Sequence, residues 1–130
     1  MTQRQLLHVY LDDYRPCPAG FALARSAEEC LLLLRECEIG ILSLDFDLGW
    51  GQPNGLSVAR AIVMERLYPR AAIYLHSSNP SARSRMMQEL HPSLPDGVRL
   101  FGAPMPEDIK RVVAAGGDVF AFYRANEETE

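Results

Sequence analysis

Three groups of polar residues in this chain have the types and spacing to do chemistry. Each group directly follows a short apolar segment, and the groups are Asp12 with Asp13, Asp45 with Asp47, and His76 with Ser77, Ser78 and Asn79. Short apolar segments bounded by such polar and turn residues are typical of buried strands. Ligands of open α/β sheets bind at the carboxyl ends of the strands. We therefore expect the three groups to share one edge of a sheet.

The four aspartates predict a site for a divalent cation. Mg²⁺ binds proteins through a few carboxylates and completes its shell with waters and with phosphate oxygens of the ligand. A cation would also offset the repulsion among the acids, which otherwise makes one of them keep its proton. We predict Mg²⁺, or another divalent cation, on Asp13 and Asp45 first, with Asp12 or Asp47 as a further ligand. The alternative is that these acids only form turns, and their repetition on two strands disfavours it.

The third polar group predicts a phosphate site. Asn79 is followed by a proline, and this pair is typical of the start of a helix. The amides at the start of a helix bind anions readily, because they lack partners within the helix. Ser77 and the amides around Ser78 and Asn79 are therefore candidates to hold phosphate oxygens.

Three further side chains could take part in phosphate chemistry. Asp45 could attack phosphorus once a cation neutralises the phosphate charge. His76 could carry a proton near neutral pH, although a structural hydrogen bond is an equal alternative. Arg15 could grip a phosphate with its planar guanidinium, or pair with Asp12 or Asp13 and order its own loop. The sequence leaves these alternatives open.

Strand and helix patterns alternate along the chain and define the elements that would carry these residues. The expected strands cover about 6–11, 21–25, 41–44, 71–75 and 98–101. The expected helices begin at the capping residues Ser26, Asn54 and Asn79 and end near residues 36, 67 and 90, and a last helix covers 106–114. This order predicts a parallel sheet with right-handed crossovers. Residues 119–123 fit either an added strand or a docking helix.

Two segments beside the acids are rich in turn residues. Segment 14–20 holds two prolines and a glycine, which exclude a regular helix and predict a loop. Segment 49–55 holds three glycines and a proline, and a flexible loop there could close over a ligand. Trp50, the only tryptophan, lies in this second loop and could either pack against the protein or stack on a base.

Composition places the chain among globular proteins with one core. We predict a single domain over residues 1–124 and an acidic, mobile tail over 125–130. The net charge of −4 gives no general attraction to nucleic acid or to an anionic membrane. Three cysteines without metal-ligand spacing, and no apolar segment long enough to span a bilayer, predict a cytoplasmic protein. The sequence does not determine how many chains assemble.

The order of these features resembles a response-regulator receiver domain. Receivers carry an acidic pair after the first strand, which falls on Asp12 and Asp13 and implies metal binding there. By the same resemblance Asp45 is the phosphoacceptor and Ser77 the hydroxyl residue after the fourth strand. Two features depart from receivers. The lysine expected after the fifth strand is replaced by Ala103, and the first helix is replaced by the loop 14–20, which should leave the sheet near Asp12 uncovered.

With these departures, three motifs resemble the cyclic-phosphate processing receiver domains. The motifs are Asp-Asp-x-Arg-Pro-x-Pro at 12–18, Leu-Asp-x-Asp-Leu-Gly at 44–49 and His-Ser-x-Asn-Pro at 76–80. The resemblance implies an α/β, flavodoxin-like or receiver-like three-layer sandwich, with a five-stranded parallel sheet and a loop in place of the first helix. It also implies a role in handling cyclic phosphates that arise in RNA repair or ADP-ribose metabolism.

The leading hypothesis is a metal-dependent phosphoesterase site that binds a cyclic phosphate ester on a nucleotide-like ligand or RNA end and opens it. The second hypothesis is a signalling module, either phosphorylated on Asp45 or binding a partner without phosphorylation. The missing lysine disfavours ordinary phosphorelay switching. A phosphatase of the haloacid dehalogenase type shares the Asp-x-Asp pair but carries it after its first strand, and is the least favoured. The sequence does not distinguish hydrolysis from binding alone.

Overall fold

A five-stranded parallel sheet forms the centre of the computed structural model, which describes residues 6–127. The strands are β1 (Leu7–Leu11), β2 (Ala22–Ala24), β3 (Ile39–Leu44), β4 (Ala72–Leu75) and β5 (Arg99–Phe101). Their order in the sheet is β2-β1-β3-β4-β5, and all neighbours are parallel. The predicted parallel sheet is confirmed. The strand order reverses between β1 and β3, which is where open α/β sheets bind ligands.

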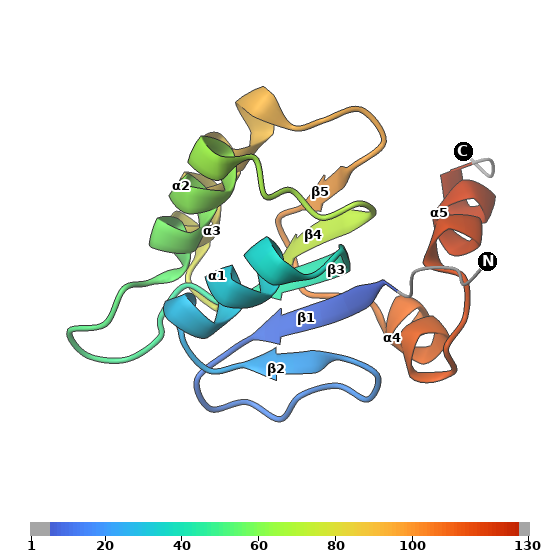
Figure 1. The fold of residues 1–130 in the computed structure, drawn as a ribbon, viewed down its shortest axis with the longest axis horizontal. Coiled ribbons are helices and arrows are strands. Elements are labelled where there is room, and N and C mark those ends of the chain that lie inside the picture. Colours follow the sequence, from blue (N-terminus) through green and yellow to red (C-terminus); the bar gives the residue numbers. More distant parts are fainter. Residues whose placement is uncertain (1–5, 128–130) are drawn as a thin grey trace.

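Helices cover both faces of this sheet and complete a three-layer sandwich (Figure 1). The first face carries α1 (Ala27–Glu36), α2 (Gly55–Glu65) and α3 (Pro80–Leu90), and a short 3₁₀ helix, η1 (His91–Ser93), follows α3. The second face carries α4 (Glu107–Ala114) and α5 (Val119–Glu127). Alternate strand residues serve the two cores: Leu42 and Leu44 face the first, and Ile41 the second. No helix within residues 6–127 combines the length and apolar character needed to cross a membrane.

The helix starts that frame the site follow from local side-chain chemistry. Ser26 Oγ accepts the Glu29 N–H, and Asn54 Oδ1 accepts the Ser57 N–H. Asn79 Oδ1 accepts the amide of the third helical residue of α3, which begins with a proline. Each of these bonds satisfies an amide that the helix itself leaves without a partner. The three predicted helix starts are therefore confirmed.

The second face of the sheet is covered, so the expectation of an open sheet near Asp12 is wrong. Residues 119–123, which fitted either a strand or a helix, form the first half of α5. The helix α4 packs directly on the loop 14–20, since a Cβ on Gly20 would lie 2.7 Å from the Val113 carbonyl oxygen. Tyr10 of β1 belongs to the core that α4 and α5 share. The loop lacks a helix of its own because its two prolines exclude one, and α4 takes over the covering role.

The helix α5 extends further than the sequence indicated. The predicted tail begins at residue 125, but residues 125–127 continue α5. Glu127 forms an ion pair with Arg99 of β5, which ties the end of the helix to the edge of the sheet. Residues 128–130, the remainder of the predicted tail, lie outside the described residues, as do residues 1–5 of the predicted domain.

Candidate functional site

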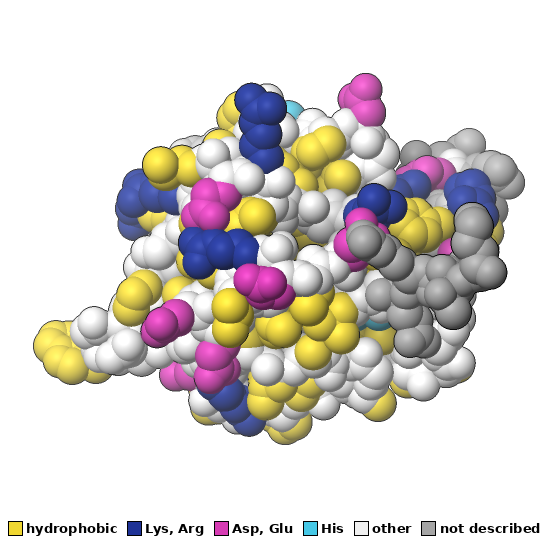
Figure 2. Space-filling view, viewed as in Figure 1, with side chains coloured by type: hydrophobic (Ala, Val, Ile, Leu, Met, Phe, Trp, Pro, Cys, Tyr) yellow, Lys and Arg dark blue, Asp and Glu magenta, His cyan; other side chains and the backbone are white. Residues whose placement is uncertain are grey.

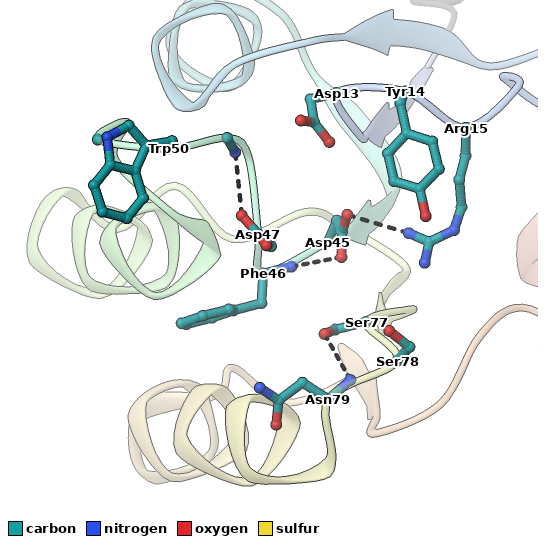
Figure 3. Close-up of a pocket in the computed structure, with 12 residues that line it drawn as sticks. Asp13, Tyr14, Arg15, Asp45, Phe46, Asp47, Trp50, Ser77, Ser78 and Asn79 are labelled. Carbon is teal, nitrogen blue, oxygen red and sulfur yellow. Dashed lines mark hydrogen bonds and ion pairs between the residues drawn. The ribbon is translucent and has the colours of Figure 1, made fainter.

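The three predicted polar groups meet at the carboxyl ends of β1, β3 and β4. The Asp45 N–H donates to the Leu11 carbonyl at 3.0 Å, and the His76 N–H donates to the Leu44 carbonyl at 3.0 Å, which joins the three strand ends. A cavity of about 630 Å³ opens there (Figure 3). It is lined by Asp13, Tyr14, Arg15, Asp45, Phe46, Asp47, Gly49, Trp50, Gly51, Ser77, Ser78 and Asn79. The predicted convergence on one edge is confirmed for all three groups.

Three of the four aspartates line the cavity, and we call Asp13, Asp45 and Asp47 the outer set. Asp13, Asp45 and Asp47 line the cavity, and their carboxylates are drawn around the same space in Figure 3. Asp12 is fully buried behind the cavity wall and does not line it. Asp13 forms no ion pair with any residue of the described part of the chain. An all-oxygen set of this kind fits a hard cation such as Mg²⁺, which Asp13, Asp45 and Asp47 would hold.

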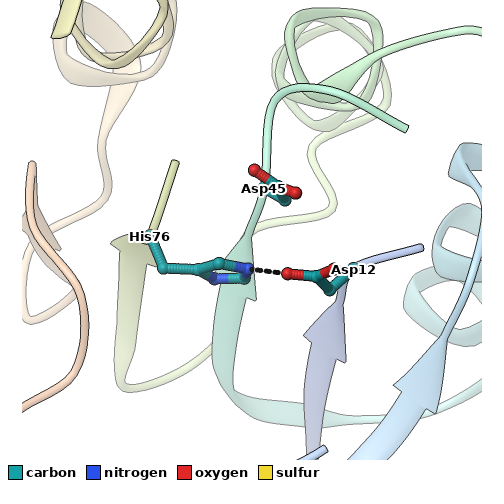
Figure 4. A group of neighbouring side chains, drawn as sticks. All are labelled: Asp12, Asp45 and His76. Carbon is teal, nitrogen blue, oxygen red and sulfur yellow. Dashed lines mark hydrogen bonds and ion pairs between the residues drawn. The ribbon is translucent and has the colours of Figure 1, made fainter. Parts of the chain in front are cut away.

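A second arrangement of possible ligands lies deeper. Asp12, Asp45 and His76 offer atoms that all lie within 4.8 Å of one another (Figure 4). However, Asp12 Oδ2 already accepts hydrogen bonds from Arg15 Nη1 at 2.8 Å and from His76 Nε2 at 3.0 Å. A cation in this position would have to displace the guanidinium. The outer aspartates are therefore the better candidate site.

Arg15 stands between the two buried carboxylates. Its Nη1 donates to Asp12 Oδ2 at 2.8 Å and to Asp45 Oδ2 at 3.1 Å, and its side chain is 28% exposed. Arg25 of the segment after β2 donates to the carbonyls of Asp12 and Arg15, and so clamps the turn that carries both. The guanidinium also lies over the Tyr14 ring at 5.1 Å from its centroid. Arg15 thus orders its loop and also lines the cavity, so the two predicted roles are compatible.

Asp12 is an ionised carboxylate inside the protein. Burial raises the pKa of this group, but the hydrogen bonds it accepts outweigh burial and lower the pKa to about 2. Its Oδ1 accepts the Tyr14 N–H at 3.0 Å and the Arg15 N–H at 2.9 Å, in addition to the two bonds at Oδ2. All of its acceptor directions are used within the protein.

Asp45 has the opposite electrostatic balance. Burial raises its pKa, the Phe46 N–H at 2.8 Å lowers it, and the neighbouring charges of Asp12 and Asp13 raise it again. Arg15 offsets only part of this. The net result is a raised pKa at a carboxylate that faces the cavity. Asp45 is therefore the member of the cluster that gains most from an added positive charge.

His76 lies beneath the cavity, which favours the structural hydrogen bond over the proton carrier, the two roles that the sequence left open. The side chain is buried, its ring stacks on Tyr10 with centroids 4.4 Å apart, and it does not line the cavity. Its Nε2 meets Asp12 Oδ2 and its Nδ1 lies 2.6 Å from Ser43 Oγ (Figure 4). Burial lowers the pKa of His76, and the Asp12 carboxylate opposes that shift. Both ring nitrogens are thus engaged within the protein.

The predicted phosphate-binding residues after β4 are only partly available. Ser77 Oγ accepts the Asn79 N–H at 3.1 Å, and Asn79 Oδ1 caps α3. The Arg83 guanidinium donates to the Ser77 carbonyl and holds this turn in place. Ser78 is exposed and lines the cavity. Of the three residues, Ser78 is the one whose side chain is free of bonds to described residues.

The loop between β3 and α2 extends away from the body of the protein (Figure 1). Gly49 and Gly51 have φ angles of +110° and +73°, a conformation that favours glycine. Trp50 between them lines the cavity and is 99% exposed. The corresponding projection in Figure 2 ends in hydrophobic side chains. The indole of Trp50 is therefore not packed against the described part of the protein.

Three residues that the sequence analysis did not single out help to build the site. They are Tyr10, which stacks on His76, Ser43, which bonds its Nδ1, and Arg25, which clamps the turn. Ser43 did carry a signal, because it is the polar residue inside the apolar segment 41–44. Tyr10 and Arg25 carried none, since the contact of Tyr10 depends on the pairing of β1, β3 and β4, and that of Arg25 on the pairing of β1 with β2.

Comparisons with known proteins agree with this fold. The model of the cyclic-phosphate processing receiver domain matches residues 7–92, whereas a search of curated proteins found no match. The receiver domain of the Francisella response regulator 1452 is 11% identical, with a TM-score of 0.54 over 85% of this chain and 95% of that one. A CheY-like receiver domain from Methanospirillum hungatei JF-1 is 13% identical, with a TM-score of 0.51 over 85% and 96%.

The fold is therefore that of a receiver-like, flavodoxin-like α/β domain. Within this class, the chain belongs to the cyclic-phosphate processing receiver domain family, whose model covers more than half of it. The resemblance drawn from the three sequence motifs is confirmed.

Proposed function

We propose that the cavity binds a cyclic phosphate ester on a nucleotide-like ligand and hydrolyses it with the help of a divalent cation. The observation that carries the proposal is the convergence of three carboxylates and Arg15 on one cavity. The family to which the chain belongs supports the choice of a cyclic phosphate. Mg²⁺ is the preferred cation, because the donors are carboxylate oxygens.

In this proposal each cavity residue has a defined task. Asp13, Asp45 and Asp47 would hold the cation, which supplies charge neutralisation at the phosphate. Arg15 binds a phosphate oxygen through the part of its guanidinium that faces the cavity. A carboxylate of the cavity accepts a proton from the attacking water. Water oxygen bonds to phosphorus, one ester P–O bond breaks, and the departing oxygen gains a proton, leaving a phosphomonoester and a free hydroxyl.

The position of Trp50 is the reason for proposing a nucleotide as part of the ligand. An indole that is 99% exposed at the rim of a cavity offers its flat face to a base, and each stacked base contributes about 1–3 kcal/mol. Because Trp50 is the only tryptophan, its fluorescence reports this contact directly. We expect quenching by adenosine 2',3'-cyclic phosphate and none by inorganic phosphate.

The test of the function is incubation with Mg²⁺ and nucleoside 2',3'-cyclic phosphates, followed by ³¹P NMR. We expect the cyclic phosphate resonance to be replaced by that of a monoester. Asp13→Asn and Asp45→Asn should remove turnover, whereas Asp96→Asn, which changes an exposed acid in the loop before β5, should not. Absence of both binding and turnover for all four nucleosides and for a cyclic phosphate of ADP-ribose would contradict the proposal.

A signalling role is the second candidate, favoured by the receiver fold and by the place of Asp45 at the end of β3. The chain has a single lysine, Lys110, which pairs with Glu107 of α4 and does not line the cavity. Ala103 also lies outside the cavity. Treatment with a small phosphodonor such as acetyl phosphate tests this role. A mass increase of one phosphoryl group, lost in Asp45→Asn, would support it.

A further inference from the structure

We propose that Ser43, His76 and Asp12, which we call the buried triad, act together as positioning residues that fix Arg15 as a permanent cation of the cavity. The proposal rests on the function above only in naming phosphate as the ligand. It gives Asp12 a different task from cation binding. It also predicts that phosphate binds to this protein without any metal ion.

The direction of each hydrogen bond in the buried triad follows from its acid. Asp12 accepts two backbone N–H groups at Oδ1 and the Arg15 guanidinium at Oδ2, so this carboxylate is an acceptor at both oxygens. His76 Nε2, 3.0 Å from Asp12 Oδ2, must therefore carry a proton and donate it. Neutral histidine holds one proton, so Nδ1 is bare and accepts the hydroxyl proton of Ser43 at 2.6 Å. Asp12 thus sets the tautomer of His76, and the Ser43 hydroxyl complements it by donating to the bare Nδ1.

The buried triad is a support and not a nucleophilic site. Ser43 is completely buried within β3 and does not line the large cavity, so its hydroxyl cannot reach a ligand there. The Tyr10 ring stacks on the His76 ring with an angle of only 3° between the planes. This contact covers one face of the imidazole and restricts its rotation. The side chain of Asp12 is therefore held from behind by His76 and in front by Arg15.

Arg15 keeps donors for a ligand after it has bound the two aspartates. Both bonds use Nη1, and Nε and Nη2 have no partner among residues 6–127. These two nitrogens form the flat edge of the guanidinium that suits two phosphate oxygens. A guanidinium fixed in advance loses little rotational freedom when it binds, which strengthens binding. Arg15 thus places a positive charge between the carboxylates of Asp12 and Asp45, where it can attract an anion.

The first experiment measures the binding of inorganic phosphate at pH 7.5 in the presence of EDTA, by isothermal titration calorimetry. We expect the wild-type protein to bind phosphate without metal. Ser43→Ala should weaken binding about 5-fold and Arg15→Lys more than 10-fold, because each removes or loosens hydrogen bonds to the anion or its anchor. Ile41→Val is the matched control, since it changes a buried residue on the same face of β3 outside the buried triad, and it should leave binding unchanged.

The second experiment reads the tautomer of His76 directly and needs no variant. Long-range ¹H–¹⁵N NMR spectra of the wild-type protein should show a bare Nδ1 and a protonated Nε2. In the Ser43→Ala protein the Nδ1 resonance should shift, because Nδ1 loses the hydrogen bond from the Ser43 hydroxyl. A protonated Nδ1 in the wild-type protein, or unchanged phosphate binding in Ser43→Ala, would overturn the proposal. Failure of cyclic phosphate turnover with phosphate binding intact would count against the proposed function alone.

Discussion

At the scale of single residues, the two adjacent aspartates after β1 have different tasks. Asp12 is buried with a pKa of about 2, whereas Asp13 lines the cavity without an ion pair to a described residue. Their sequence positions could be predicted to lie at the site, because both follow an apolar strand. Which of the two is buried could not, since Arg15 could pair with either one and His76 joins Asp12 only after the strands pair.

The first prediction compares these two aspartates. Asp12→Asn should lower the free energy of unfolding by about 3 kcal/mol, because it leaves the partly buried Arg15 guanidinium and the buried His76 ring without a charged acceptor. Asp13→Asn should change it by less than about 0.5 kcal/mol, as is usual for an exposed or partly exposed polar residue. Urea denaturation followed by circular dichroism measures both.

For cation binding, Asp13 should matter although it contributes little to stability. Titration with Mn²⁺, a spectroscopic substitute for Mg²⁺, should show weaker binding in Asp13→Asn, because this side chain belongs to the outer set. Equal cation affinity in the wild-type and Asp13→Asn proteins would show that the outer aspartates are not the cation site.

At the scale of elements, the connection from β3 to α2 places Asp45 by a very close packing of backbone. The Gly55 N–H donates to the Phe46 carbonyl at 2.7 Å. A Cβ on Gly55 would lie 2.2 Å from the Asp45 carbonyl oxygen and 2.9 Å from the Phe46 Cα. The capping residues of the helices were visible in the sequence, but this close approach was not, because a glycine gives no sign in the sequence of what it touches.

The second prediction concerns this approach. Gly55→Ala should lower the free energy of unfolding by about 3 kcal/mol, since the added methyl group meets backbone that cannot move aside cheaply. Gly102→Ala is the control, because a Cβ there meets only Met87 at 3.5 Å. Thermal denaturation of the two variants measures the difference. Equal stability of the two proteins would contradict the close packing.

The third prediction uses the pairing of β1 with β3, which shifts register beside His8. His8 Nδ1 accepts the Ile41 N–H at 3.0 Å, and burial lowers the pKa of His8 below its usual 6.5. The unfolded chain therefore binds the proton more readily. The stability that His8 contributes is complete above pH 6.5 and is lost as the pH falls through the lower pKa of the folded protein.

The variant His8→Asn isolates this contribution, because its amide oxygen can occupy the place of Nδ1 but does not titrate. Urea denaturation between pH 7.5 and 5.5 should show a smaller decline in stability for His8→Asn than for the wild-type protein. His76 titrates in both proteins and contributes equally to both declines. An identical pH dependence would contradict the role of His8.

At the scale of the whole molecule, the second face of the sheet shows where prediction from sequence ends. The sequence predicted the sheet, the first-face helices and the place of the site. It did not predict that α4 and α5 would cover the other face, because residues 119–123 are apolar enough for either a strand or a helix. Their conformation is decided by contacts with Tyr74 and the rest of the second core, which only the assembled sheet provides.

The fourth prediction tests how α5 is attached. Tyr74 and Tyr123 are both buried, and their hydroxyl groups lie 2.8 Å apart. Tyr74→Phe or Tyr123→Phe alone should each cost about 1–3 kcal/mol, since one buried hydroxyl group loses its partner. The double variant should cost less than the sum of the two. Additive single effects in urea denaturation would show that the two hydroxyl groups do not interact.

The two outermost strands, β2 and β5, have only three residues each. Exposed strand edges are templates on which further protein molecules can add strands, and short edges blunt this tendency. The interior strands β3 and β4 are buried along their whole length and would promote aggregation if they lay at an edge of the sheet. Because the short strands β2 and β5 form the two edges of the sheet, β3 and β4 have no free edge on which another molecule could add a strand.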